Sequence, residues 1–301
     1  MKHQRTRRAK RTAPPRARAA SSLSARPRAR ADAMSAPIAP GITPDDIRFV
    51  NRVVIALAVG FFALNRVLCP RFAPKYMRDK PFLLAFELCC LVPLTYCAFA
   101  GTRGWFEDVA VGYETAHARL HKAVPASSRK MILVNCGFQI WDFLISLGHE
   151  KLNSIEMLLH HSLAAALCLA GLQLGFAQYY GLFFMGVTEI SSLPLVYVDL
   201  GKYYPELVRR RPGTDLFFKV VFGLLFIAVR DVLFIKYSIQ LWKDSFAVLE
   251  AGTTKFPNLV KGFLVTNLFF NVLQIMWTKL LLDGLMEVIN GGKKEEEKKK
   301  K

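Results

Sequence analysis

The residues best suited to chemistry in this chain are a few ionisable side chains inside long apolar segments. His160 and His161 stand together in one such segment, Asp142 lies in the segment before it and Glu189 in the segment after it. A neutral imidazole can act as a nucleophile or a general base toward a thioester, and a nearby carboxylate can fix its tautomer. Ionisable groups at membrane depth are costly and usually face the interior of a helical bundle. We therefore predict Asp142, Glu189 and the two histidines as catalytic residues, with His160 carrying the reaction.

Polar side chains also recur at helical spacing within these segments. Steps of four, three, four and three residues put one set on a single helical face. That face holds Asn135, Gln139, Asp142, Ser146 and His149. The segment near the C-terminus repeats the spacing with Asn267, Asn271, Gln274 and Thr278. Glu156 shares a face with His160, whereas His161 is rotated by about 100° and is expected to point elsewhere.

These polar faces have two interpretations. They line a chamber that opens into the membrane, or their amides bridge neighbouring helices, each contact contributing on the order of 1 kcal/mol. We favour bridging for the amides alone and a site for Asp142, Glu156, His160 and Glu189 together, because several ionisable groups are hard to explain as bridges. The residues predicted to bind a substrate are Asn135, Gln139, Glu156, Ser192, Asn267, Asn271 and Gln274.

Seven segments of about 20 mostly apolar residues must position these groups. They are roughly 49–69, 81–100, 131–148, 156–175, 178–198, 216–238 and 260–285. No alternating strand pattern of a membrane barrel is visible, and a bilayer forces the backbone to satisfy its own hydrogen bonds, so we expect helices. The predicted fold is an all-α polytopic membrane protein with about seven transmembrane helices.

Charges inside the sixth segment need an explanation of their own. Arg230 and Asp231 are adjacent, so they cannot share a helix face. Either each pairs with a different helix or this part of the segment lies at the membrane interface, and we favour the interface. The Lys and Arg residues near the segments place the C-terminus in the cytosol.

The formal net charge of +18 is concentrated at the two ends of a chain that is 52% hydrophobic. Residues 1–48 carry a net charge of +9 and residues 293–301 a net charge of +3. This distribution is typical of a membrane protein with charged extensions and argues against a nucleic-acid partner. We predict a disordered arm at 1–46, a membrane domain at 47–290 and a Lys-rich tail at 291–301. The six Cys lie in or beside apolar segments and are predicted to be packing residues.

The arm and the tail bear on localisation. The first 31 residues are rich in Arg and lack acidic residues. They suit an organelle transit peptide, an arm that binds a membrane surface or nucleic acid or, as we favour, a plain basic tail, and Met34 is an alternative start. Lys298 and Lys299 stand at the positions of a dilysine retrieval signal of the endoplasmic reticulum. That membrane is the expected location, with another organelle membrane as the alternative.

Three short motifs, taken in order, resemble the TLC domain, the family of ceramide synthases and of small TLC-domain-containing proteins of lipid homeostasis. They are Trp141-Asp142, the run from Met157 to His161 that ends in Leu-His-His, and the run Thr188-Glu189-Ile190-Ser191-Ser192-Leu193-Pro194. The small TLC-domain-containing branch is the most similar, and the resemblance covers about residues 50–288. It implies a helical bundle around a lipid-accommodating cavity in the endoplasmic reticulum or a related membrane.

The resemblance also implies a chemistry. In ceramide synthases the His pair and two Asp residues about thirty positions later are implicated in acyl transfer from acyl-CoA to a sphingoid amine. His160 and His161 match the pair, whereas Glu189 and Ser192 occupy the Asp positions, so one carboxylate is missing. The implied partners are membrane lipids, with acyl-CoA and a sphingoid base as candidate substrates, and no cofactor or metal is expected. The oligomeric state stays open.

Three other functions are compatible with the sequence. The same chamber would serve a non-catalytic protein that binds, senses or moves lipids. A di-metal desaturase is suggested by His117, His121 and the His pair, but such sites need about eight His and the membrane domain has five. A cargo receptor or transporter would suit the basic tail, although no repeat of broken helices supports transport.

Overall fold

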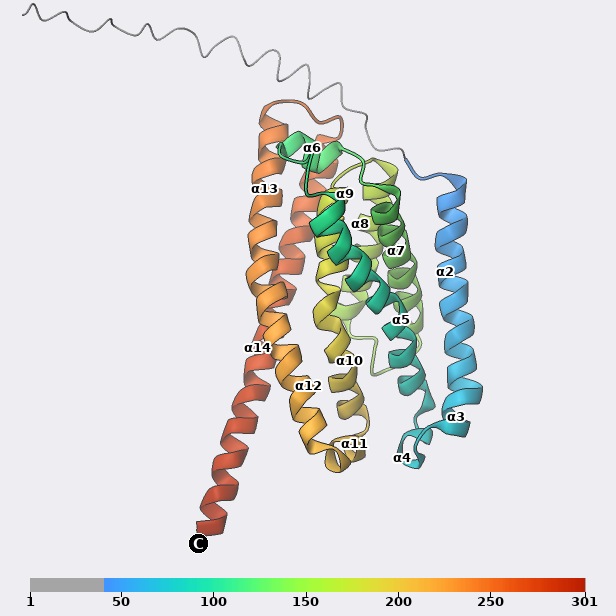
Figure 1. The fold of residues 1–301 in the computed structure, drawn as a ribbon, viewed down its shortest axis with the longest axis vertical. Helices are drawn as coiled ribbons and strands as arrows, with labels where there is room; N and C mark the ends of the chain where they lie inside the picture. Colours follow the sequence, from blue (N-terminus) through green and yellow to red (C-terminus); the bar gives the residue numbers. More distant parts are fainter. Residues whose placement is uncertain (1–40, 301) are drawn as a thin grey trace, which may run out of the picture. The chain divides into compact units, whose positions relative to one another are not determined.

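The computed structural model describes the backbone of residues 41–300, with side chains to Met286. The described part is built of helices and contains no strand (Figure 1). The predicted arm at 1–46 therefore lies almost wholly outside the described residues. The helix α14 continues to Lys300, so the predicted tail at 291–301 is helical up to that residue.

The helical elements, in chain order, have bounds that follow the sequence signals for helix starts and stops. Pro occupies the first turn of several of them, where its missing N–H needs no partner. The N-terminal half contains α2 (Pro44–Ala63), η1 (Leu64–Leu68), α3 (Cys69–Phe72), α4 (Lys75–Arg78), α5 (Pro81–Arg103), η2 (Gly104–Asp108), α6 (Ala116–His121) and α7 (Ala126–Leu147). The C-terminal half contains α8 (Ile155–Gln173), α9 (Gln178–Leu182), η3 (Phe183–Val187), α10 (Glu189–Tyr203), α11 (Pro205–Arg210), α12 (Pro212–Leu225), η4 (Phe226–Leu233), α13 (Phe234–Glu250) and α14 (Pro257–Lys300). The η elements are π-helical turns within longer helices.

Among the described residues, six helices are long and apolar enough to cross a membrane. They span 44–72, 81–108, 126–147, 155–173, 178–203 and 257–286, and they contain or closely match six of the seven predicted segments. The seventh prediction, 216–238, is helical as expected but is not among the six. It lies inside the continuous stretch formed by α12, η4 and α13, and it carries Lys219, Arg230 and Asp231, which are costly in hydrocarbon.

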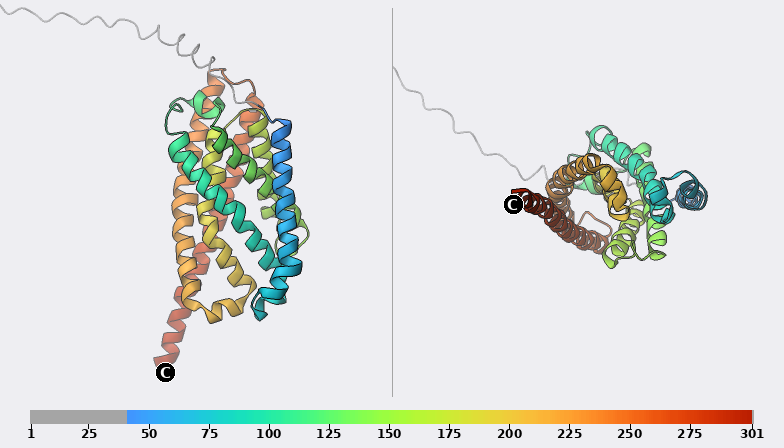
Figure 2. Two further views of the ribbon diagram at one scale, coloured as in Figure 1. Left: turned by 45° about the vertical axis from the view of Figure 1, so that its right-hand side comes forward. Right: turned by 90° about the horizontal axis from the view of Figure 1, so that it is seen from below.

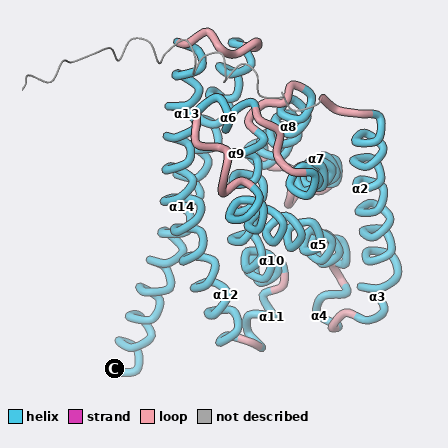
Figure 3. The backbone as a smooth tube through the Cα atoms, turned by 45° about the horizontal axis from the view of Figure 1, so that its top comes forward, coloured by secondary structure: helices cyan, strands magenta, loops and turns pink. Residues whose placement is uncertain are grey.

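The long helices run alongside one another in alternating directions (Figures 1 and 2). The segments 81–108, 126–147 and 178–203 are the most buried, whereas 44–72 is the most exposed. The exposed helix α2 packs on α7 and α5, and α14 packs against α13, η4 and α8. Short helices and loops connect the long ones at their ends (Figure 3). Two of the three most buried segments, 126–147 and 178–203, carry predicted site residues, and 81–108 carries none.

A close helix crossing holds α10 in place. Gly101 of α5 faces Gly186 of η3, and a Cβ added at Gly101 would lie 2.4 Å from the Cα of Gly186. Small residues at such crossings let two backbones approach closely in membrane bundles. Because Glu189 begins α10 directly after this crossing, the two glycines fix the depth at which its carboxylate enters the interior.

Candidate functional site

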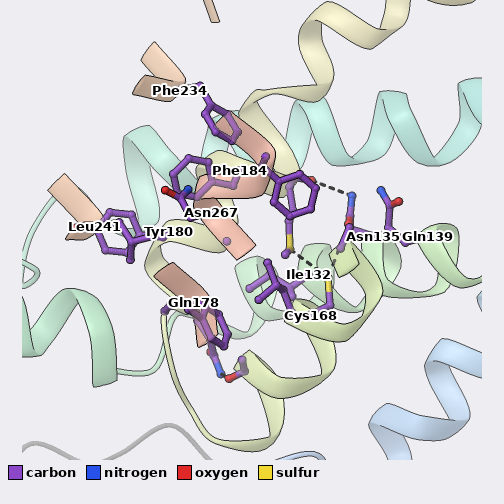
Figure 4. A pocket seen from close by; sticks show the side chains of 18 of the residues that line it. Ile132, Asn135, Gln139, Cys168, Gln178, Tyr180, Phe184, Phe234, Leu241 and Asn267 are labelled. Carbon is purple, nitrogen blue, oxygen red and sulfur yellow. Dashed lines mark hydrogen bonds between the residues drawn. The ribbon is translucent and has the colours of Figure 1, made fainter. Parts of the chain in front are cut away.

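A cavity of about 80 Å³ lies between α7, α8, α9, η3, α10, η4, α13 and α14. Its wall is mainly apolar and aromatic, and Figure 4 shows Ile132, Phe184 and Phe234 around it. Polar groups enter the wall from α7, α8, α9, α10, η4 and α14. An apolar space with a few convergent polar groups is typical of a small-molecule site.

His161 is held rigidly at the side of this cavity by two residues of α7. Its Nδ1 lies 2.7 Å from Oε1 of Gln139, and its Nε2 lies 3.2 Å from Oδ1 of Asp142. Ser146 donates a hydrogen bond of 2.9 Å to the same carboxylate oxygen. His161 therefore points toward α7, and Asp142 orients His161 instead of His160. Both ring nitrogens of His161 are engaged, which leaves neither free for a substrate.

His160 lines the cavity itself and is held by aromatic rings instead of polar partners. The ring centroids of Phe270 and Trp277 on α14 each lie 5.4 Å from that of His160, in edge-to-face contact. His160 also lies edge-to-face with His161, at 5.0 Å. The Nδ1 atom of His160 is buried without a hydrogen-bond partner. Of the two histidines, His160 is thus the one with a ring nitrogen available to react.

Glu189 faces the cavity beside a buried arginine. An oxygen of Glu189 accepts a hydrogen bond of 2.7 Å from Ser192 and lies 3.5 Å from Nη2 of Arg230. Arg230 also donates to the hydroxyl groups of Ser191, at 2.8 Å, and Ser192, at 2.9 Å. Both charged side chains are about nine-tenths buried. Ser192, at the position where the resembled motif has a second Asp, therefore serves as a hydrogen-bonding partner of an ion pair.

The π-helical turn η4 brings Arg230 to this position. Helices with π turns shift the register of their side chains and are frequent at functional sites. Arg230 points toward α10, while the adjacent Asp231 accepts a hydrogen bond of 2.7 Å from Thr278 on α14. Each charge is paired with a different helix, which is the alternative that the sequence offers beside the interface interpretation. Lys219 pairs with Asp215 within α12 instead, at 2.6 Å.

The family follows from comparison with known proteins. A sequence profile described as the TLC domain matches residues 82–283, two thirds of the chain. The chain belongs to the TLC domain family. A search of curated proteins finds no match. The protein is accordingly an integral membrane protein of a lipid-related family, and the His pair, Asp142, Glu189 and Arg230 all lie inside the matched region.

Two of the predicted amides in this TLC domain line the cavity from α7. Asn135 is fully buried, donates to the carbonyl oxygen of Met185 at 3.0 Å and lies near Cys168 (Figure 4). Gln139 borders the cavity while its oxygen engages His161. Both amides therefore bridge helices, as favoured from the sequence, and they border the cavity at the same time.

The amides of α14 have different surroundings. Asn267 lines the cavity, accepts a hydrogen bond of 2.9 Å from Trp242 and donates to Ser238 at 3.1 Å. Asn271 donates to the same Ser238 at 3.1 Å and is not part of the wall. Gln274 lines the cavity, and its Oε1 is buried without a partner. Gln274 is the one of these amides whose hydrogen bonding is left incomplete.

Glu156 is not brought into the cavity. It lies in the first turn of α8, is half-buried and is not part of the cavity wall. Asp142 is likewise behind the wall, in contact with His161. The convergent residues are therefore His160, Glu189, Asn135, Gln139, Asn267 and Gln274, together with Arg230, which the sequence patterns do not assign to the site.

A second polar cluster, not anticipated from the sequence, borders the cavity through Tyr180. The Tyr180 hydroxyl donates to Asp244 of α13, which also binds Arg119 of α6 through two hydrogen bonds of 2.5 and 2.7 Å. These hydrogen bonds raise the pKa of Arg119. The remaining nitrogen of Arg119 donates to the carbonyl oxygens of Tyr113 and Glu114. The cluster ties the loop between α5 and α7 to the bundle.

His117 and His121 lie in the same short helix, α6. Their ring centroids are 4.8 Å apart, and His121 contacts the ring of Phe176, which lines the cavity. Burial and, to a smaller extent, the neighbouring His117 lower the pKa of His121 to about 4. Among the described residues no group of three or more His, Cys, Asp or Glu side chains is arranged to hold a metal ion. The six Cys are buried and unpaired, as expected of packing residues.

Proposed function

We propose that this TLC-domain protein transfers an acyl group from acyl-CoA to the amine of a membrane lipid, with His160 as the reacting group. The observation that carries the proposal is the difference within the His pair. His161 has both ring nitrogens engaged, whereas His160 presents a buried Nδ1 without a partner in an apolar cavity. A neutral imidazole in such a space is a competent nucleophile or general base.

The reaction balances without an oxidant or a metal. The amine nitrogen of the acceptor forms a bond to the thioester carbonyl carbon, and the carbon–sulfur bond breaks. The proton lost by the amine ends on the leaving thiolate, and His160 carries it between them. If His160 instead attacks first, the lone pair of its ring nitrogen forms a transient bond to the acyl carbon, the thiolate leaves, and the amine then displaces the imidazole. The products are unchanged. Exclusion of water from the apolar cavity limits hydrolysis of the thioester.

The remaining groups support His160 indirectly. Asp142 and Gln139 fix His161, whose ring packs edge-to-face on His160, so they position the reacting ring through their neighbour. The acceptor implied by the family resemblance is a sphingoid base, and the implied location is the endoplasmic reticulum. Both are part of the proposal.

The test is an assay of the purified full-length protein in detergent micelles with acyl-CoA and sphingoid base. His160→Ala is expected to lower the rate roughly 100-fold or more, in line with the loss of a general base or nucleophile. His149→Ala is the matched control, because His149 is half-buried against Phe82 and outside the cavity wall. Equal background product from the wild type and His160→Ala would overturn the proposal.

A second candidate function, non-catalytic lipid binding or sensing, is favoured by one observation. Ser192, at the position of the second carboxylate, is occupied with Arg230 and Glu189 and offers no acid for catalysis. In this case the cavity would bind a lipid without changing it. Lipid analysis of cells lacking the protein distinguishes the two functions. Loss of one product class supports the enzyme, and a broad shift in acyl saturation or phospholipid balance supports the sensor.

A further inference from the structure

Arg230 is a buried cation in the cavity wall whose hydrogen bonds are incomplete. Its Nε and Nη2 atoms are engaged by Ser191, Ser192 and Glu189. Nη1 has no partner among the described residues, although Arg230 is part of the cavity wall. A guanidinium has five N–H donors and no acceptor, so the two N–H groups of Nη1 call for an acceptor in the cavity.

The ion pair with Glu189 does not engage the N–H groups of Nη1 of Arg230. The distance of 3.5 Å from Nη2 to the carboxylate is longer than a good charge-assisted hydrogen bond, which is about 2.7–2.9 Å. The same carboxylate oxygen accepts the shorter hydrogen bond of Ser192. Glu189 therefore balances the formal charge of Arg230 and leaves its outer donors free. Planar guanidinium donors fit phosphate and carboxylate oxygens especially well.

A second group in the same wall is also unsatisfied. Gln274 is 2% exposed, and its Oε1 is buried without a partner. On α14, Gln274 follows Phe270 by four residues and precedes Trp277 by three. The rings of Phe270 and Trp277 both contact His160. Residues at these spacings share a helix face, so Gln274 lies on the face of α14 that covers His160. An unpaired buried acceptor at a cavity calls for a ligand with an N–H or O–H donor.

We infer that the cavity binds a lipid whose polar headgroup carries an oxyanion, a phosphate or a carboxylate, held by Nη1 of Arg230. The apolar and aromatic wall takes the chain of this lipid, and Gln274 accepts a hydrogen bond from a hydroxyl or amine of its headgroup. The inference rests on the cavity being the lipid site of the proposed function and does not depend on acyl transfer. A cationic sphingoid base without an anionic group would leave Nη1 unpaired.

The test measures binding of four single-chain lipids to the purified full-length protein in nonionic detergent. The lipids are lysophosphatidic acid, oleic acid, neutral monooleoylglycerol and cationic sphingosine. Tighter binding of one or both anionic lipids, by roughly tenfold or more, is expected from a charge-assisted hydrogen bond. Preference for lysophosphatidic acid identifies a phosphate headgroup, and preference for oleic acid identifies a carboxylate. Equal or tighter binding of the neutral or cationic lipid would overturn the inference.

Variants separate a ligand site from a purely structural ion pair. Arg230→Gln alone would leave Glu189 buried without a counter-ion, so the double variant Glu189→Gln/Arg230→Gln is used instead. It is expected to lose the preference for anionic lipids while still binding the neutral one. Glu189→Gln alone leaves Arg230 without its counter-ion, so thermal unfolding first checks that this variant is folded, and its binding of the anionic lipids is expected to tighten. If both variants bind all four lipids as the wild type does, the pair is structural and the inference fails.

Two controls complete the design. Lys219→Gln removes a charge from the same helical stretch, at a residue that is 44% exposed and paired with Asp215, and it is expected to leave headgroup preference unchanged. His160→Ala is expected to retain the preference even where acyl transfer is lost. Loss of activity with retained binding would count against neither the headgroup assignment nor the cavity. Retained activity with no headgroup preference would count against the headgroup assignment alone.

Discussion

Two arginine–carboxylate clusters border the cavity and differ in how completely their hydrogen bonds are satisfied. Arg119 engages Asp244 through Nε and Nη2, and its Nη1 donates to two backbone carbonyl oxygens. Arg230 engages its neighbours through Nε and Nη2 only. The first cluster is complete without a ligand, as expected of a structural tie between α6 and α13. The second is complete only when something else occupies the cavity.

The two histidines of the pair at 160 and 161 show the same contrast on a smaller scale. His161 is clamped between Gln139 and Asp142, whereas His160 has an unpartnered nitrogen in an aromatic surrounding. Buried polar groups are normally hydrogen-bonded, so each exception requires an explanation. Among the described residues, nine side-chain atoms are buried without a partner, and those of His160, Gln178 and Gln274 belong to the wall of one cavity. Nη1 of Arg230 adds an unused donor to this wall.

The largest expected effect concerns the Arg119 cluster. Arg119→Met leaves Asp244 buried without its cation, and loss of one partner from such a pair costs about 3–5 kcal/mol of unfolding free energy. Thermal unfolding of the full-length protein in detergent measures this loss. Arg103→Met breaks an exposed pair with Glu107 and is expected to cost less than about 1 kcal/mol. Equal effects of the two variants would show that the Arg119 cluster is not a structural tie.

The next effect separates the two histidines. His161→Phe removes the partner of Gln139 and Asp142 and is expected to cost at least about 2 kcal/mol, because Gln139 loses its partner and Asp142 keeps only the hydrogen bond of Ser146. His160→Phe removes no protein hydrogen bond from Nδ1 and is expected to change stability by less than about 1 kcal/mol. The same unfolding assay compares them. A His160→Phe loss as large as that of His161→Phe would mean that His160 is a packing residue.

How far the sequence leads can be judged from particular residues. The four-three steps from Asn135 to Ser146 predict one helix face, and these residues are buried on α7. The divergence of His161 from His160 is predicted correctly, but rotation about a helix axis does not identify the neighbouring helix, so the contact of His161 with Asp142 is not predicted. The spacing of residues along α8 thus predicts which of them share a face. Tertiary packing decides which of these faces contacts α7.

The local sequence pattern does not predict which residues pair across long distances in the chain. Arg119 and Asp244 are 125 residues apart, and Arg230 reaches Ser191 across 39 residues. Adjacency of Arg230 and Asp231 predicts only that their side chains diverge. The π-helical turn that aims Arg230 at α10 has no clear signature in the sequence. Those pairings arise from the packing of whole helices, which explains why the family motifs identify Glu189 and Ser192 but not their arginine.

A smaller effect is expected from pH, through the buried His121 of α6. The pKa of His121 falls from 6.5 to about 4 on folding, so the unfolded chain binds a proton between these values that the folded protein does not. The stability contributed by neutral His121 is therefore complete above pH 6.5 and is lost as the pH falls toward 4. Unfolding measured at pH 7.5, 6 and 4.5 should show this decline. His121→Phe should flatten it, and an unchanged slope would assign the decline to other groups.

The smallest expected effect tests whether the two clusters are functionally separate. Tyr180 lines the cavity, but its hydroxyl points to Asp244, so Tyr180→Phe removes one hydrogen bond and keeps the ring. Asp244 retains Arg119, and the expected loss of stability is about 1 kcal/mol. Binding of anionic and neutral lipids should be unchanged, because the hydroxyl is already occupied. If Tyr180→Phe lowers the affinity for anionic lipids as Glu189→Gln/Arg230→Gln is expected to, then the Tyr180 hydroxyl serves the ligand, and the Arg119 cluster belongs to the binding site as well.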